Sequence, residues 1–196
     1  MNRFQEAVGL QENFPHIHPA APALLELPSG TDGVAIHNLI RCSPFLDDNS
    51  LYCYLMVCSH FSETSVVARI DGELAGVITA YIPPEQPDTL FVWQVAVAKT
   101  AQRRGLARAM LEHILQRNTL QHINWLETTV TLDNQASRGL FDSLAKRMQC
   151  DLHESIMFDR KEHFNNLHDS EYRLRIGPLG RKSDSASAVN PHRRKT

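Results

Sequence analysis

The chain has 196 residues, of which 42% are hydrophobic and 21% are charged, and its formal net charge is −2. This length suits one domain with a full core and is short for two, and the near-neutral charge gives no general attraction to nucleic acid. No apolar run approaches the roughly 18 residues that a membrane helix needs, and Pro15, Pro19 and Pro22 interrupt the N-terminus where a signal peptide would carry its apolar core. We therefore expect a cytoplasmic globular protein.

The first half of the chain predicts a strand, two helices and a hairpin. Residues 1–23 are rich in Pro, Ala and polar residues and are expected to form a flexible lead. The expected elements are a strand at Leu24–Leu27, a helix from Thr31 or Asp32 to about Ser43, a helix at Leu51–Phe61, and strands at Val66–Ile70 and Leu74–Ile82 joined by an Asp-Gly turn. In the second helix we expect Leu51, Leu55 and Cys58 on one face, with Tyr54 and Phe61 nearby, to pack inward.

The second half alternates strands and helices and ends in a polar tail. The expected elements are a strand at Leu90–Val97, a helix at Leu106–Gln116, a strand at Trp125–Val130, a helix beginning at Asp133 or Asn134, and closing strands at Ile156–Phe158 and Tyr172–Ile176. We expect residues 24–176 to form the domain and residues 177–196 to be a disordered basic tail. This order predicts a mixed α/β (α+β) layout, mostly antiparallel at first, with a parallel crossover between the two central strands.

The four cysteines are spaced widely and irregularly in a chain long enough to have its own core, which favours free thiols over a disulfide framework. They are Cys42, Cys53, Cys58 and Cys150. Cys53, Cys58 and His60 lack the paired spacing of a structural zinc site, so no metal is expected.

The junction between the strand at Leu90–Val97 and the helix at Leu106–Gln116 predicts an anion-binding turn. The amides at the start of a helix are unpaired and lie at the positive end of the helix dipole. Gly105 and Ala107 leave the backbone open to a phosphate, and positive charge surrounds it. The arginines that supply this charge are Arg103, Arg104 and Arg108.

The pattern Gln102-x-x-Gly105-x-Ala107 after such a strand resembles the pyrophosphate loop of the GCN5-related N-acetyltransferases, in which acyl-CoA binds. The Gly-Lys-Ser/Thr ending of a nucleotide hydrolase is missing, as are two glycines of the dinucleotide fingerprint. The resemblance implies a mixed twisted sheet with splayed central strands and flanking helices. It also implies that residues 102–108, including Leu106, bind acetyl-CoA, while the backbone of Val95 and Val97 pairs with the pantetheine arm.

Three further segments resemble the L-2,4-diaminobutyrate acetyltransferases of ectoine biosynthesis, within a likeness that covers about residues 24–146. They are Leu46-Asp47-x-Asn49-Ser50-x-Tyr52-x-Tyr54-Leu55, Leu90-Phe91-Val92-Trp93-Gln94-Val95-Ala96-Val97 and Glu127-Thr128-Thr129-Val130-Thr131-x-x-Asn134-x-x-Ser137. This resemblance implies acetyl transfer from acetyl-CoA to the 4-amino group of L-2,4-diaminobutyrate by a homodimer, without a metal.

Amine attack on a thioester needs an anchored CoA, a neutral amine and a donor for the developing oxyanion. Asp47 is the first candidate for holding an amino group, Tyr52 and Trp93 are candidate pocket walls, and Glu127 is a candidate acceptor of the ammonium proton. Each also has a structural alternative: Asp47 as a helix cap, Tyr52 and Trp93 as core, and Glu127 as a solvated side chain.

One position departs from the superfamily pattern. Many members carry a tyrosine, the acid for the departing thiolate, seven residues after the helix-start asparagine. Here the asparagine is Asn134, which can contact the pantetheine arm or merely cap its helix, but the later position is Phe141. An acetyltransferase for another small cationic amine and a non-catalytic acyl-CoA sensor are therefore the alternative functions.

Overall fold

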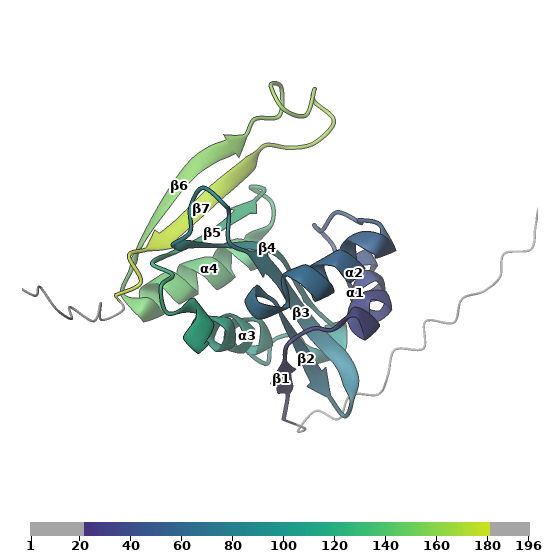
Figure 1. The fold of residues 1–196 in the computed structure, drawn as a ribbon. Helices are drawn as coiled ribbons and strands as arrows, with labels where there is room; N and C mark the ends of the chain where they lie inside the picture. The colour runs from purple at the N-terminus through teal and green to yellow at the C-terminus, as the bar shows by residue number, and fades with distance from the viewer. Residues whose placement is uncertain (1–21, 181–196) are drawn as a thin grey trace, which may run out of the picture. The chain divides into compact units, whose positions relative to one another are not determined.

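The computed structural model describes residues 22–180 (Figure 1). Most of the expected flexible lead and basic tail, residues 1–21 and 181–196, lies outside this range. The chain forms two compact units: the first contains the residues up to Ala80 together with Trp93–Ile114, and the second contains Tyr81–Val92 together with the residues from Leu115 onward.

The described elements follow the predicted order. They are β1 (Leu24–Glu26), α1 (Gly33–Arg41), α2 (Leu51–His60), β2 (Val66–Ile70), β3 (Glu73–Tyr81), β4 (Thr89–Val97), α3 (Leu106–Leu115), β5 (Trp125–Val130), α4 (Gln135–Met148), β6 (Asp151–Phe158) and β7 (Glu171–Gly177). Hydrogen bonds link the strands in the order β1-β2-β3-β4-β5-β7-β6. No helix within residues 22–180 is long and apolar enough to cross a membrane.

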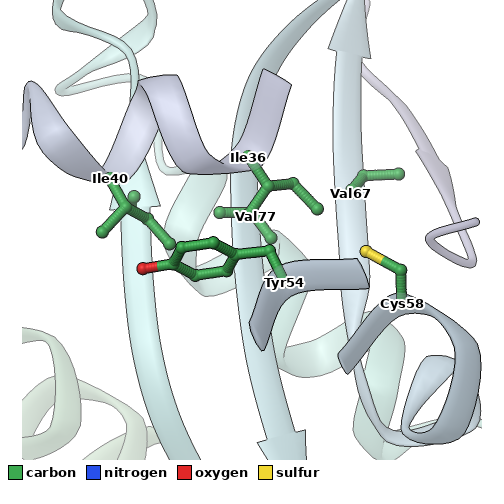
Figure 2. Close-up of a cluster of buried hydrophobic side chains, with 7 residues drawn as sticks. Ile36, Ile40, Tyr54, Cys58, Val67 and Val77 are labelled. Atoms are coloured by element: carbon green, nitrogen blue, oxygen red, sulfur yellow. The ribbon is translucent and has the colours of Figure 1, made fainter. Parts of the chain in front are cut away.

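In the first unit, α1 and α2 cover one face of β2 and β3. Figure 2 shows Ile36 and Ile40 of α1 and Tyr54 of α2 packed over Val67 and Val77, all of them buried. Burying large apolar side chains contributes about 1.5–3 kcal/mol each, so this cluster fixes α2 and the loop that precedes it. The predicted inward positions of Tyr54 and Cys58 are confirmed, whereas those of Leu51 and Phe61 are wrong because both side chains are exposed.

The other face of the same strands packs on α3. Side chains alternate across a strand, so Gly76 faces away from Val77, and a Cβ built at Gly76 would lie only 2.9 Å from Cε of Met110 in α3. Glycine at this position therefore allows α3 to approach β3 closely. The helix that follows the predicted phosphate turn is anchored in this way.

Two smaller predictions are confirmed by the backbone and by the cysteines. Asp71 and Gly72 have φ angles of 53° and 82°, as a tight hairpin turn with two left-handed residues requires. All four cysteines are free thiols, and burial raises the pKa of Cys58 to about 11, so this thiol packs as a small apolar side chain.

In the second unit, α4 covers one face of β5 and β7. Opposite residues of an antiparallel pair share a face, and Leu174 is paired with Thr128 on one side and Glu154 on the other. Arg138 of α4 forms an ion pair with Glu154, so the helix lies on this face, where Leu174 is buried. The next residues along each strand, including Glu127, face the other way.

The predicted parallel crossover between the two central strands is confirmed by the strand pairing. In the second unit, Thr89–Val92 of β4 pairs in parallel with Trp125–Thr128 of β5. The closing strands are longer than predicted, because β6 begins at Asp151 and β7 includes Gly177. Leu179 is buried and its amide bonds to Asn124, so order extends past the expected boundary at residue 176.

Candidate active site

The predicted phosphate turn lies in the first unit between β4 and α3. Gly105 has a φ of 73°, and Arg103 has a φ of 61° although it is not glycine. Left-handed residues next to right-handed ones gather successive amide groups into a concavity that suits an anion. Residues 102–105 are exposed at this point, so the turn has the backbone shape and the exposure that binding of a phosphate requires.

The side chains of the turn have different surroundings. A Cβ built at Gly105 would lie 3.5 Å from Nη2 of Arg108, so this guanidinium lies beside the open backbone. Leu106 is buried and can offer a ligand only its backbone amide. Gln102 donates from Nε2 to the carbonyl oxygen of Val97 over 3.1 Å, which ties the turn to the end of β4 and occupies one of the backbone groups predicted for pantetheine.

The loop that carries Asp47 is fixed to β4 of the same unit. The buried Gln94 donates from Nε2 to the carbonyl oxygen of Asp47 over 3.1 Å. The amide of Asn49 donates to the hydroxyl of Tyr54 over 3.4 Å, and Tyr54 belongs to the buried cluster. The carboxylate of Asp47 itself is exposed, so the backbone around it is held while the charged group is accessible.

The capping alternative for this aspartate is wrong. Ser50 caps α2, because its hydroxyl accepts from the amide of Cys53 over 3.3 Å. Asp48 instead lies 3.2 Å from Nε2 of His37 and 3.5 Å from Nε of Arg41. Neither aspartate of the loop is therefore used as the N-cap of α2.

The core alternative for the two aromatic candidates is also wrong. Tyr52 is 68% exposed and Trp93 is 38% exposed. Large aromatic side chains are usually buried when they serve only packing. The first unit thus offers Asp47, Tyr52 and Trp93 as accessible groups, as predicted for an acceptor site.

In the second unit, Glu127 is buried rather than solvated, with an exposed fraction of 2%. Its Oε1 accepts a hydrogen bond from Nη1 of Arg175, the residue directly opposite on β7. Nη1 of Arg173 lies 4.0 Å from the same oxygen. A buried carboxylate requires such pairing, because an isolated charge in the interior is very unfavourable.

Arg175 is itself held on two further sides. Its Nη1 donates to Oε1 of Gln86 over 3.1 Å, and its guanidinium lies 4.2 Å from the centre of the Trp125 ring. Burial and the charge of Glu127 raise the pKa of Tyr81, so this phenol stays protonated. Glu127 therefore lies in a fixed polar cluster of the second unit.

The sequence pattern missed Gln94, Arg173 and Arg175. The last two alternate with Tyr172, Leu174 and Ile176, and this alternation indicated a strand with one polar face. It could not indicate which carboxylate they meet, because Glu127 is 48 residues away from Arg175 in the chain.

The last two candidates lie on or before α4. Oδ1 of Asn134 accepts from the amide of Ser137 over 3.1 Å, so its predicted capping role is confirmed. Phe141 is 1% exposed and belongs to the core of the second unit. The ring thus fills space in the core, and it has no proton to donate.

Residues 34–145 of the chain match the acetyltransferase (GNAT) family. The chain is 47% identical over 155 residues to an L-2,4-diaminobutyric acid acetyltransferase of Methylotuvimicrobium alcaliphilum, which covers 79% of this chain and 90% of the relative. A protein of the same name from Bordetella parapertussis is 47% identical over 171 residues, with 84% and 92% covered. The chain belongs to the L-2,4-diaminobutyric acid acetyltransferases of the GNAT family.

A solved structure of this family has the same fold. Diaminobutyrate acetyltransferase EctA from Paenibacillus lautus, in complex with its substrate L-2,4-diaminobutyric acid and coenzyme A, matches with a TM-score of 0.78 and 34% identity. The match covers 81% of this chain and 96% of that one. The predicted GCN5-related fold and the predicted family are thus confirmed.

Proposed function

We propose that the chain transfers, in the cytoplasm, the acetyl group of acetyl-CoA to the 4-amino group of L-2,4-diaminobutyrate, giving N4-acetyl-L-2,4-diaminobutyrate and CoA, a step of ectoine biosynthesis. The observation that carries this proposal is the exposed turn with left-handed residues at Arg103 and Gly105, in a chain of this family. The amine attacks the thioester carbonyl directly, the carbon–sulfur bond breaks, and the sulfur leaves with the electron pair.

The CoA would be anchored by the turn and the strand before it. Amides of Gly105, Leu106 and Ala107 would bind the diphosphate, and Arg103, Arg104 and Arg108 would add positive charge around it. Gln102 would shape the turn through its bond to Val97. The backbone of Val95 and Val97 would pair with the pantetheine arm as an added strand does, and Asn134 would contact the arm while capping α4.

The acceptor would be handled by carboxylates and aromatic walls. In the first unit, Asp47 would bind an amino group of the acceptor, with Tyr52 and Trp93 as walls that also donate hydrogen bonds. The second unit would contribute Glu127, which binds an ammonium group and accepts its proton directly or through water. Arg175 and Arg173 both contact Oε1 of Glu127, which leaves Oε2 for this task.

The thiolate would not take its proton from the helix position that serves many relatives in the superfamily. Phe141 has no proton to donate and is buried in the core. The leaving CoA would therefore be protonated by water after it departs, because a thiol is acidic enough to leave as the anion.

The function is tested by a panel of acceptors with purified full-length protein and acetyl-CoA. L-2,4-diaminobutyrate, ornithine, lysine and spermidine are compared by release of the CoA thiol, and mass spectrometry with fragmentation locates the acetyl group. The proposal expects the highest kcat/KM for diaminobutyrate and acetylation at N4. Preference for another amine would contradict the acceptor, and CoA binding by calorimetry without turnover of any amine would favour an acyl-CoA sensor.

The CoA turn is tested by Gly105→Glu. A side chain at a φ of 73° is strained, and its carboxylate would occupy the anion site, so CoA affinity is expected to fall by at least about 100-fold. Gly139→Glu is the matched control, because a Cβ at Gly139 on α4 meets no atom within 4 Å. Calorimetric titration with CoA that gave equal affinities for both variants would place the phosphates elsewhere.

We also infer that the protein is a homodimer. β6 is the last strand of the order, and Ile156, Met157 and Phe158 on it are exposed. An edge strand with exposed apolar side chains favours pairing with a second strand. Light scattering after size exclusion is expected to give twice the mass of one chain, and Ile156→Lys to shift it towards one chain; a single-chain mass for the wild type would contradict the inference.

A further inference from the structure

The polar face of the second unit carries more positive charge than Glu127 needs. Glu127 on β5 is opposite Arg175 on β7, and Arg173, two residues earlier on β7, shares this face. Both guanidinium groups contact the same carboxylate oxygen. At Glu127, two cations thus face one anion.

The two arginines differ in their exposure and in how many groups of the protein they contact. Arg175 is 27% exposed, donates to Glu127 and to Gln86, and stacks on Trp125. Arg173 is 37% exposed, lies 4.0 Å from Glu127, and donates from Nη2 to the hydroxyl of the exposed Ser155 over 3.3 Å. Arg173 is therefore the guanidinium that is more accessible to a further anion.

We propose that Arg173 binds the carboxylate of the acceptor and thereby selects an amino acid over a simple diamine. This inference rests on the proposed function, in which the acceptor carries two ammonium groups and one carboxylate. Arg173 and Glu127 place a cation and an anion 4.0 Å apart on one face, so a molecule with an ammonium and a carboxylate a few bonds apart can engage both. A planar guanidinium suits a carboxylate because it donates two parallel hydrogen bonds.

The test compares two acceptors that differ only in the carboxylate. 1,3-Diaminopropane has the skeleton and both amines of 2,4-diaminobutyrate without the acid group. For Arg173→Gln, kcat/KM with diaminobutyrate at saturating acetyl-CoA is expected to fall by about 10–100-fold, as for the loss of one charge-assisted bidentate contact. The kinetic constant for 1,3-diaminopropane, measured as a substrate or as a competitive inhibitor, is expected to change by less than about threefold.

Two further variants keep the result decisive. Arg173→Lys retains the charge and is expected to recover part of the activity with diaminobutyrate. Arg160→Gln is the control, since Arg160 pairs with the exposed Asp169 over 2.8 Å in the segment that links β6 and β7, and it should leave both constants unchanged.

The outcomes separate this inference from the proposed function. Equal losses for the two acceptors in Arg173→Gln, or no loss for diaminobutyrate, would overturn the role of Arg173 while the wild type still acetylates diaminobutyrate. A wild type that acetylates 1,3-diaminopropane as well as it does diaminobutyrate would also overturn it. A wild type inactive on diaminobutyrate but active on another amine would instead contradict the proposed function.

Discussion

Within residues 22–180, each unit holds one buried carboxylate paired with an arginine, and the two pairs differ in their surroundings. In the first unit, Asp32 pairs with Arg69 of β2. In the second, Glu127 pairs with Arg175 of β7. The side chains of Asp32 and Glu127 are 7% and 2% exposed, so burial alone does not distinguish them.

The first carboxylate is satisfied by its own local backbone. Oδ2 of Asp32 accepts from the amide of Ser29 over 2.8 Å and from its hydroxyl over 3.1 Å, and Arg69 also donates to Glu26 over 3.1 Å. Two anions, Glu26 of β1 and Asp32 before α1, thus share the one cation of Arg69 on β2. This arrangement ties β1 and the turn before α1 to β2.

The second carboxylate is held by side chains from distant segments. Oε1 of Glu127 contacts Arg175 and Arg173, so two cations share one anion. This reversal of the charge ratio distinguishes the two pairs: the carboxylate of Asp32 is held by local hydrogen bonds from Ser29, while the second pair has an additional cation that a carboxylate ligand could bind.

The largest expected effect is on stability, when each arginine is replaced by methionine. Arg175→Met leaves Glu127 buried without its main partner and is expected to lower the free energy of unfolding by about 3–5 kcal/mol. Arg69→Met leaves Asp32 with both bonds from Ser29, so a smaller loss of about 1–3 kcal/mol is expected. Urea unfolding at pH 7 measures both, and a larger loss for Arg69→Met would reverse the comparison.

The next effect separates the two carboxylates by activity. Glu127→Gln removes the proposed ammonium and proton acceptor and is expected to lower kcat/KM for diaminobutyrate by about 100-fold. Asp32→Asn keeps the shape of the structural pair, and kcat/KM is expected to change by less than about threefold. Initial rates at saturating acetyl-CoA measure kcat/KM for both variants. Equal losses in the two variants would show that the two carboxylates do not differ in function.

Asp47 extends the comparison to an exposed carboxylate. Asp47→Ala is expected to raise the KM for diaminobutyrate by about 10-fold or more, since one charge-assisted bond contributes roughly 1.5–3 kcal/mol, while the KM for acetyl-CoA changes little. Asp142→Ala on the surface of α4 is the control and should affect neither constant. If both KM values rose together in Asp47→Ala, Asp47 would not belong to the acceptor site.

The sequence could predict what depends on neighbouring residues. The turn at Gly105 and the Asp71-Gly72 hairpin follow from local backbone preferences, and both have the expected positive φ angles. The buried face of α2 was predicted only in part, because apolar residues surround that helix and periodicity does not select a side. Tyr54 and Cys58 are buried as expected, but Leu51 is exposed. The pairing of Glu127 with Arg175 depends on the register of β5 with β7, which a single sequence does not specify.

The smallest effect is a pH dependence that belongs to the first pair. Although burial alone would raise it, the bonds from Ser29 and Arg69 lower the pKa of Asp32. The stabilisation is therefore complete above about pH 4, the ordinary pKa of an aspartate, and is lost as the pH falls through the lower pKa of the folded state. As the pH falls below about 4, where this loss occurs, the wild type should lose more unfolding free energy than Asp32→Asn does. Asp142→Asn, on an exposed site, should behave as the wild type, and parallel urea-unfolding curves for the wild type and Asp32→Asn would show that Asp32 is not the group that titrates.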